Sequence, residues 1–396
     1  MSTYLAISEL AAAVERPIAE AVGLPNRAYT SSEFFRLELE RIFAPSWACL
    51  GHACDVPQPG DLRPMRLLGV PLLMVRAAGD AMRVFHNVCS HRGNELVWEP
   101  CRVKGAIRCP YHAWTYDLEG RLMGTPNIGG PGRHTVDGFD RGAHGLRPVR
   151  SAVWLDLVFV NLSGDAEPFE EFIRPLAERF ERLGGPGYER RLRPAATHGE
   201  FRFDVRANWK LALENNLDAS HLPWIHPSLN RQSPLEDHYC FLDQAAFAGQ
   251  GSSAYDTVPH ESPALPRIEA WPARTGEYPS LYPNVFVGGH GDHFWSMVLE
   301  PTAPDRTVER WRSYFVDDAA ESAEFESARA AIRERWACIL GEDMSVVEGM
   351  QRGRSSPAFD GGLFAPVLDP PIHHLHRWVA KRLASPEPDG SNAATV

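Results

Sequence analysis

The chain has 396 residues, of which 44% are hydrophobic and 23% charged, a composition typical of a globular protein of about two domains. Its net charge of −11 argues against a general nucleic-acid binder, which needs cations to contact phosphates. No apolar run approaches the ~20 residues of a membrane span and the N-terminus lacks the pattern of a signal peptide, so we expect no nucleic-acid or membrane partner and a cytoplasmic location.

The N-terminal part of the chain is predicted to be helical. Residues 31–44 carry apolar side chains at helical spacing behind Ser31, a candidate N-cap, with Glu33 in the first turn. From residue 50 to 165 the pattern changes to short apolar runs separated by Gly, Pro and Asp. Such runs predict a small antiparallel β module.

The second half of the chain mixes helices with strands. Residues 168–183 predict a helix, and residues 200–215 predict a strand that leads into a helix. Three consecutive strands are predicted at 283–289, 293–301 and 307–316, and a long helix at 319–340. The sequence therefore predicts an α+β protein, in which a β module is inserted after an N-terminal helix and precedes a larger domain with an antiparallel sheet.

Two cysteine–histidine pairs lie in the predicted β module. Cys89 and His91 stand two residues apart, and Cys109 and His112 follow in a second loop-like segment. Structural zinc sites usually pair Cys with Cys and His with His, whereas each pair here mixes the two types. A Rieske [2Fe–2S] cluster needs two Cys on one iron and two His on the other, which two such loops supply. We favour the cluster; zinc and chance remain the alternatives.

A second group of chemically active residues lies at 208–226, "NWKLALENNLDASHLPWIH". Asp218 and His221 are three residues apart and share a helix face, and Pro223 then breaks the helix so that His226 can turn inward. Two imidazoles and a distant carboxylate make a 2-His-1-carboxylate iron site with open positions for dioxygen and substrate. The alternative is a polar surface helix with incidental histidines.

Together these motifs resemble the α subunits of Rieske non-haem iron oxygenases, over nearly the whole chain from "YTSSEFFRLELERIFAPSW" to about residue 380. Asn94 and Tyr111 stand where respiratory Rieske proteins carry disulfide cysteines, so the resemblance is to the oxygenase type. It implies a helix-grip (Bet v 1/START-like) catalytic domain after the Rieske domain. The expected divisions are an N-terminal helical segment (1–44), the Rieske domain (45–165), the catalytic domain (166–385) and a disordered tail (386–396).

The resemblance also implies the remaining site residues. The third iron ligand is an acid far downstream, and the candidates are Glu342, Asp343, Glu348, Asp360 and Asp369. Asp343 fits best, because it precedes a Gln-x-Gly motif by several residues, as the family's ligand does. Asp218 is expected to lie outside the ligand set, as a hydrogen-bonded bridge for electron transfer between His221 and His112 of a neighbouring subunit. That role implies a homotrimer, while Asn208 is expected either near the iron or as a helix cap.

The expected function is that of a terminal oxygenase that hydroxylates or oxidatively demethylates a small substrate. No dinucleotide-binding motif is present, so we expect no bound NAD or flavin and a separate NAD(P)H-dependent reductase, with or without a ferredoxin. An electron-transfer protein without oxygenase activity is the alternative of another class. An oxygenase-like protein that has lost catalysis is a further alternative.

The substrate is predicted less directly. Leu213, Leu217 and aromatic residues of the strands from 278 to 298 are expected to line the pocket. These aromatic residues indicate either core packing or a cage for a quaternary ammonium group. The segment "SLYPNVFVGG" resembles the corresponding segment of choline- and betaine-oxidising enzymes. Ring hydroxylation of an aromatic compound or acid is the alternative, and an acid would need a cation such as Arg206 or Arg310. The aromatic residues meant are Tyr278, Tyr282, Phe286, Phe294 and Trp295.

Overall fold

The chain forms two units, which are described separately: residues 46–166 make one, and the segments before and after them make the other. The computed structural model describes residues 11–242, 246–255 and 264–384. The tail predicted at 386–396 lies outside these residues, as do the first ten residues of the predicted N-terminal segment. In the described part of the chain, no helix has both the length and the apolar character needed to cross a membrane.

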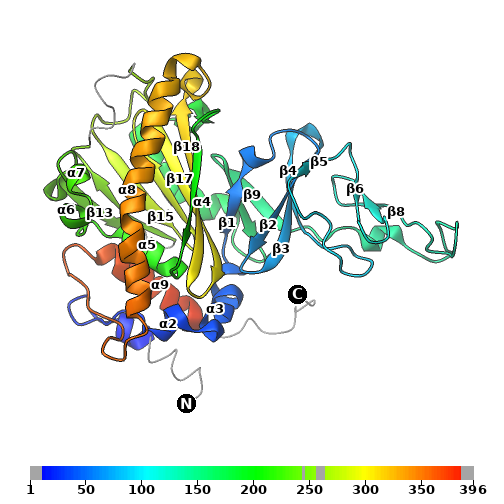
Figure 1. The fold of residues 1–396 in the computed structure, drawn as a ribbon, viewed down its shortest axis with the longest axis horizontal. Helices are drawn as coiled ribbons and strands as arrows, with labels where there is room; N and C mark the ends of the chain where they lie inside the picture. The colour runs from blue at the N-terminus through cyan, green and yellow to red at the C-terminus, as the bar shows by residue number, and fades with distance from the viewer. Residues whose placement is uncertain (1–10, 243–245, 256–263, 385–396) are drawn as a thin grey trace. The chain divides into compact units, whose positions relative to one another are not determined.

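The unit of residues 46–166 is built from three small antiparallel sheets (Figure 1). Its buried core includes Leu73, Phe85 and Tyr116, and it also contains Cys89 and Cys109. The strand orders are β1-β10-β9, β4-β3-β2-β5 and β6-β7-β8. Their bounds are β1 (Ala48–His52), β2 (Asp61–Leu67), β3 (Val70–Arg76), β4 (Met82–His86), β5 (Cys101–Arg102), β6 (Ile107–Arg108), β7 (Thr115–Tyr116), β8 (Leu122–Gly124), β9 (Arg150–Trp154) and β10 (Leu157–Asn161).

The larger unit contains an eight-stranded antiparallel sheet, in the order β11-β18-β17-β16-β15-β14-β13, with β12 paired to β18. Its central strands are buried along most of their length, which explains why their sequences are rich in aromatic and β-branched residues. The bounds are β11 (Leu192–Pro194), β12 (Glu200–Val205), β13 (His238–Leu242), β14 (Phe247–Ser252), β15 (Gly276–Leu281), β16 (Val285–Gly289), β17 (His293–Ala303) and β18 (Arg306–Val316).

Helices pack against this sheet, and the longest, α8, runs across its strands (Figure 1). The α-helices are α2 (Arg27–Thr30), α3 (Ser32–Glu38), α4 (Phe169–Gly184), α5 (Trp209–Leu217), α6 (Leu222–Ile225), α7 (Pro227–Asn230), α8 (Glu326–Gly353) and α9 (Pro370–Ala384). A π-helical turn, Leu39–Phe43, follows α3. Short 3₁₀ turns lie at Ala53–Asp55, Ala78–Asp80, Arg141–His144, Tyr188–Arg191, Leu235–Asp237, Asp317–Ala320 and Ala323–Phe325.

The predicted α+β class is confirmed, with an antiparallel β module followed by a helix-grip domain. Ser31 caps α3 as predicted, because its hydroxyl accepts hydrogen bonds from the Glu33 and Phe34 amides. The helix predicted at 319–340 begins later, after two 3₁₀ turns, and continues to Gly353. It continues because side chains of its later turns, including Val347 and Gln351, are buried, and this packing outweighs the interior glycines Gly341 and Gly349.

Candidate metal sites

The two Cys–His pairs lie on two loops with the same backbone hydrogen bonds. The amide four residues after each cysteine donates to the cysteine carbonyl at 3.0 Å, from Gly93 to Cys89 and from Ala113 to Cys109. The amide of each cysteine donates to the carbonyl of the fifth residue after it, from Cys89 to Asn94 and from Cys109 to Trp114, at 2.8 Å in both loops. Gly93 and Ala113 both have positive φ, at 70° and 57°, as this tight turn requires. The sequence thus builds two equivalent loops, each presenting one thiol and one imidazole.

The side chains of these loops are arranged by kind. Cys89 and Cys109 are buried, and burial raises the pKa of the Cys89 thiol, with a further rise caused by the neighbouring Cys109. The His91 and His112 rings lie with their centroids 4.7 Å apart. Paired thiols and paired imidazoles fit a cluster whose two irons have different ligands.

Among the described residues, His221, His226 and Asp343 form a group of metal-binding side chains whose ligand atoms all lie within 4.8 Å of one another. The four loop residues are not part of that group. Their arrangement by kind favours two irons with different ligands over a single zinc ion.

Tyr116 is a residue of this site that the sequence reasoning missed. Its hydroxyl lies 3.2 Å from the Cys89 Sγ, accepts a hydrogen bond from the Ser90 amide at 3.1 Å and lies 3.0 Å from the Ser90 hydroxyl. Tyr116 is on β7, two residues after Trp114, whose ring stacks on His91 at 4.6 Å. Its position soon after the "CPYH" motif was the available signal, but its contact with the other loop depends on tertiary structure.

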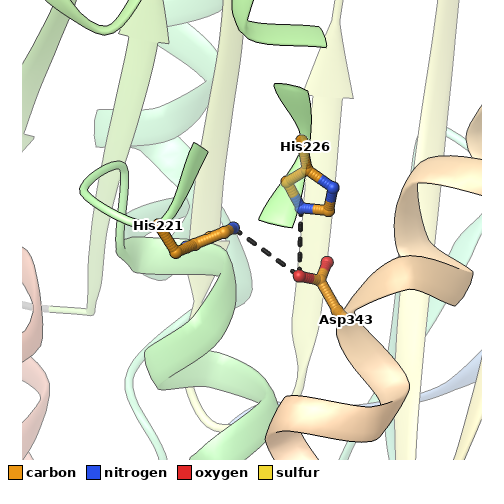
Figure 2. Close-up of side chains that lie close together, drawn as sticks. All are labelled: His221, His226 and Asp343. Carbon is orange, nitrogen blue, oxygen red and sulfur yellow. Dashed lines mark ion pairs between the residues drawn. The ribbon is translucent and has the colours of Figure 1, made fainter. Parts of the chain in front are cut away.

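The second group of predicted residues comes together around one point (Figure 2). His221 lies in the turn after α5, His226 lies between α6 and α7, and Asp343 projects from α8. The Asp343 Oδ1 is 3.0 Å from the His226 Nε2 and 3.6 Å from the His221 Nε2. Asp343 and His226 are buried. Two imidazole nitrogens and one carboxylate on one side of a point are the donor set of a facial iron site.

The other nitrogen of each imidazole contacts a carboxylate. His221 Nδ1 lies 3.2 Å from the Asp218 Oδ2, and His226 Nδ1 lies 2.6 Å from the Glu342 Oε2. These contacts fix the ring orientations and leave both Nε2 atoms directed to Asp343. Asn215 on α5 donates a hydrogen bond to the Asp343 Oδ1 at 3.2 Å, so all three candidate ligands are held by a neighbour.

The charges of these neighbours shift the pKa values of the site. Burial lowers the pKa of His226, but hydrogen bonds with Asp343 and Glu342 outweigh burial and raise it above its usual range. For Asp218, burial alone would raise the pKa. Hydrogen bonds from His221 and Ser220 outweigh burial and hold the pKa below its ordinary value. Asp218 therefore carries a negative charge beside His221.

The other acids considered as ligands lie elsewhere or have another role. Glu348 accepts hydrogen bonds from Arg206, Asp360 accepts from the Asn26 amide and Asp369 accepts from the Ala365 amide. Glu342 contacts the far nitrogen of His226 and is not part of the three-residue group.

Asn208 takes the capping role that was one of its two predicted roles. Its side chain accepts from the Lys210 amide at the start of α5 and donates to the carbonyls of Pro304 and Tyr29. Asn215, two turns or about 10 Å further along the helix, contacts Asp343 instead. The expectation that Asn208 lies near the iron is therefore wrong, because α5 points its other end to the site.

A pocket adjoins His221, His226 and Asp343, and aromatic side chains form much of its wall. The predicted Tyr278, Phe286 and Trp295 line it, together with Tyr255 and Trp336. The Trp336 ring centroid lies 4.9 Å from that of Trp295 and 6.1 Å from that of Tyr278. Trp336 and Asp343 stand two turns apart on α8, so the pocket extends about 10 Å along this helix from the metal-binding end.

Four residues expected in the pocket lie elsewhere. Phe294 alternates with Trp295 on β17 and packs against Phe180 and Trp271 on the other face. Tyr282 hydrogen-bonds through its hydroxyl to His374 at 3.1 Å. From α5, Ala212, Asn215 and Asn216 face the pocket, whereas Leu213 and Leu217 are wholly buried outside it.

Two carboxyl groups contribute to the pocket wall. Glu309 and Asp343 line it, and no Lys or Arg is among the described residues of its wall. Arg206 pairs with Glu348 instead, and Arg310 pairs with Glu300. The pocket therefore favours a cationic or neutral ligand over an anionic one.

Comparisons with known proteins agree with this architecture. The family model of the Rieske [2Fe-2S] domain matches residues 46–137, and that of the ring hydroxylating alpha subunit catalytic domain matches residues 192–385. The chain is 27% identical over 345 residues to the carnitine monooxygenase oxygenase subunit of Acinetobacter baumannii, covering 85% of this chain and 86% of that protein.

Two further proteins are similar over nearly the full length. The glycine betaine monooxygenase oxygenase subunit of Pseudomonas aeruginosa is 26% identical over 398 residues, covering 91% of this chain and 89% of the relative. A crystal structure of a quaternary ammonium Rieske monooxygenase with L-carnitine superposes with a TM-score of 0.77, at 24% identity, over 94% of this chain and 98% of that one. At this identity the superposition bears on the fold.

Proposed function

The chain belongs to the Rieske non-haem iron oxygenases as an α subunit, and from this we propose that it oxidises a quaternary ammonium compound. The predicted oxygenase class is confirmed: the protein is an oxidoreductase with a Rieske [2Fe–2S] cluster and a mononuclear iron as cofactors. As the oxygenase subunit of a system with several components, it takes its electrons from a separate reductase. The further proposals concern the residues, the assembly and the substrate.

We assign the cofactors to the two groups described above. Cys89 and Cys109 would hold one iron of the cluster, and His91 and His112 would hold the other; the two equivalent loops support this assignment. For the mononuclear iron we assign His221, His226 and Asp343, on the support of their converging donor atoms. The bound iron would activate dioxygen with electrons that arrive through the cluster.

Asp218 is proposed as the positioning residue between the two kinds of metal site. It contacts His221 at 3.2 Å and is partly exposed, so that a residue of another subunit can approach it. We propose that His112 of a neighbouring subunit does so in a homotrimer, and that a ferredoxin is an optional electron carrier between the reductase and the cluster. The head-to-tail ring is the closed assembly in which every Asp218 meets a neighbour.

The observation that carries the substrate proposal is an aromatic pocket with acidic groups and no described Lys or Arg in its wall. Aromatic faces attract a cation that has no N–H to donate, as in recognition of quaternary ammonium groups. Hydroxylation of a carbon bound to the nitrogen places one oxygen atom in the C–H bond, while the other leaves as water with two electrons and two protons. The C–N bond then breaks, its electron pair leaves with the tertiary amine, and the hydroxyl group loses its proton. The carbon becomes a carbonyl compound, so the net reaction is a dealkylation.

Ring hydroxylation of an aromatic compound is the second candidate. The aromatic wall would also stack on a neutral ring. An aromatic acid fits less well, because Arg206 and Arg310 are paired outside the pocket and its carboxylate would face Glu309.

The test is substrate-dependent oxygen uptake with the iron-loaded protein, NADH and a surrogate reductase. Glycine betaine, L-carnitine and choline are compared with naphthalene and benzoate, and amine and aldehyde products are measured. The proposal is supported if the wild-type protein turns over at least one quaternary ammonium compound. This turnover should be lost in Asp343→Ala and kept in Asp360→Ala. Turnover restricted to the aromatic compounds would contradict it.

A further inference from the structure

We propose that Glu309 is the counter-ion that makes this pocket select a permanently charged ammonium group over a neutral group of the same shape. The inference rests on the proposed function, since it names a residue that determines specificity for the same substrate class. Sequence reasoning gave no sign of this role, because Glu309 lies among charged residues in "TVERWRSYF".

Strand register places Glu309 in the pocket wall. On β18, Glu309 pairs with Leu299 of β17 on one side and with Phe203 of β12 on the other. It is buried and lines the pocket together with Asp343 and Trp295. Arg310 and Arg312 have the opposite parity on the strand and therefore point to the other face of the sheet.

Glu309 differs from the other acids of this sheet in having no basic partner. Glu300 pairs with Arg310, Glu200 with Arg312 and Glu277 with Arg179. For Glu309, no ion pair or hydrogen bond to its carboxyl group is found within the described residues. A buried carboxyl group without a donor or a cation is costly, so its presence in a pocket wall points to a ligand that supplies the missing charge.

A bound cation would stabilise the charged form of Glu309. Burial, together with the nearby negative charge of Asp343, raises the pKa of Glu309 to about 8, so near neutral pH the carboxyl group holds a proton that a bound cation would displace. With iron bound, the Asp343 charge is committed to the metal, which leaves Glu309 as the remaining carboxyl group of the wall. A quaternary nitrogen offers charge but no N–H, and Trp295 and Trp336 supply aromatic faces for its methyl groups.

The experiment compares isosteric ligands that differ only in charge. Glycine betaine is paired with 3,3-dimethylbutanoate and choline with 3,3-dimethyl-1-butanol, in which carbon replaces the charged nitrogen. Anaerobic calorimetry with the iron-loaded protein gives, for each pair, the dissociation constant of the carbon analogue divided by that of the ammonium ligand. Glu309→Gln should lower this ratio by about tenfold or more through weaker binding of the ammonium group, with little change for the uncharged 3,3-dimethyl-1-butanol.

Matched variants separate charge from folding. Glu300→Gln removes a carboxylate from the neighbouring strand outside the pocket, and it should leave the ratio unchanged. Glu309→Asp keeps the charge and should retain part of the selectivity, which a purely structural role would not produce. Iron and sulfide contents are measured for each variant so that loss of a cofactor is not mistaken for loss of recognition.

The outcomes distinguish this inference from the proposed function. If the wild-type protein binds the ammonium ligands and Glu309→Gln leaves the ratio of dissociation constants unchanged, the role of Glu309 is overturned and the proposed function stands. Wild-type protein that binds no ammonium ligand while it hydroxylates an aromatic compound would overturn the substrate class and this inference with it.

Discussion

Removal of the Glu342 carboxylate is expected to weaken iron binding although Glu342 is outside the proposed ligand set. Its Oε2 lies 2.6 Å from the His226 Nδ1, and this contact directs the opposite nitrogen of the ring to Asp343. Carboxylates that contact a ligating histidine in this way change metal affinity by roughly 10–100-fold when removed. That range corresponds to about 1.4–2.7 kcal/mol of binding free energy.

We expect Glu342→Ala to fall in the lower half of this range. The Glu342 side chain is 37% exposed, so water can replace part of the lost hydrogen bond, whereas the His226 side chain is only 3% exposed. Glu342→Gln keeps an acceptor for the Nδ1 hydrogen but removes the charge, and it should give an intermediate loss.

The assay is competition for Fe(II) with a chelator of known affinity under anaerobic conditions, with acid-labile sulfide as a separate count of the cluster. Glu348→Ala is the matched control, because Glu348 is on the same helix but pairs with Arg206. Iron affinity of Glu342→Ala equal to that of the wild type, or an equal loss in Glu348→Ala, would refute the reasoning.

Three other variants have distinct expected outcomes. Tyr116→Phe removes a hydroxyl 3.2 Å from the Cys89 Sγ, so it should lower the reduction potential of the cluster in a voltammetric titration; an unchanged potential would contradict a hydrogen bond to sulfur. Asn208→Ala removes the N-cap of α5 and should lower the free energy of unfolding by about 1 kcal/mol in urea titration while iron affinity stays at the wild-type value. Asp218→Asn should slow oxidation of the reduced cluster in single-turnover experiments without changing the iron and sulfide contents, and a wild-type rate would argue against an electron-transfer role.

The two loops that carry the candidate cluster ligands illustrate what local sequence determines. Cys89 with His91, and Cys109 with His112, are each held by hydrogen bonds that span five residues at most, so spacing alone defines both loops. The contact between Asp218 and His221 is also local, but the two residues lie in the turn between α5 and α6 and not on one helix face, as their spacing had predicted. Short-range geometry follows from residue order because few backbone conformations close such turns.

The third acid of the iron site was harder to predict, because contact between α8 and the pocket spans more than 100 residues of chain. Resemblance to a family favoured Asp343 among five acids, but spacing in this sequence could not separate it from Glu342. Adjacent helix residues point about 100° apart, and the packing of α8 decides which of them faces the histidines. The structure directs Asp343 to both Nε2 atoms and Glu342 to the far side of His226.

The sequence by itself indicated the α+β class through its periodicity and the candidate ligand loops through short-range spacing, and its resemblance to known oxygenases indicated the family. Tertiary structure alone decided which strand and helix faces meet in the pocket. It turned Trp295 inward and Phe294 outward, and it placed Asn215 rather than Asn208 beside Asp343. It also left Glu309 without a basic partner among the residues that the structure describes, and this environment depends on long-range register, which no local pattern encodes.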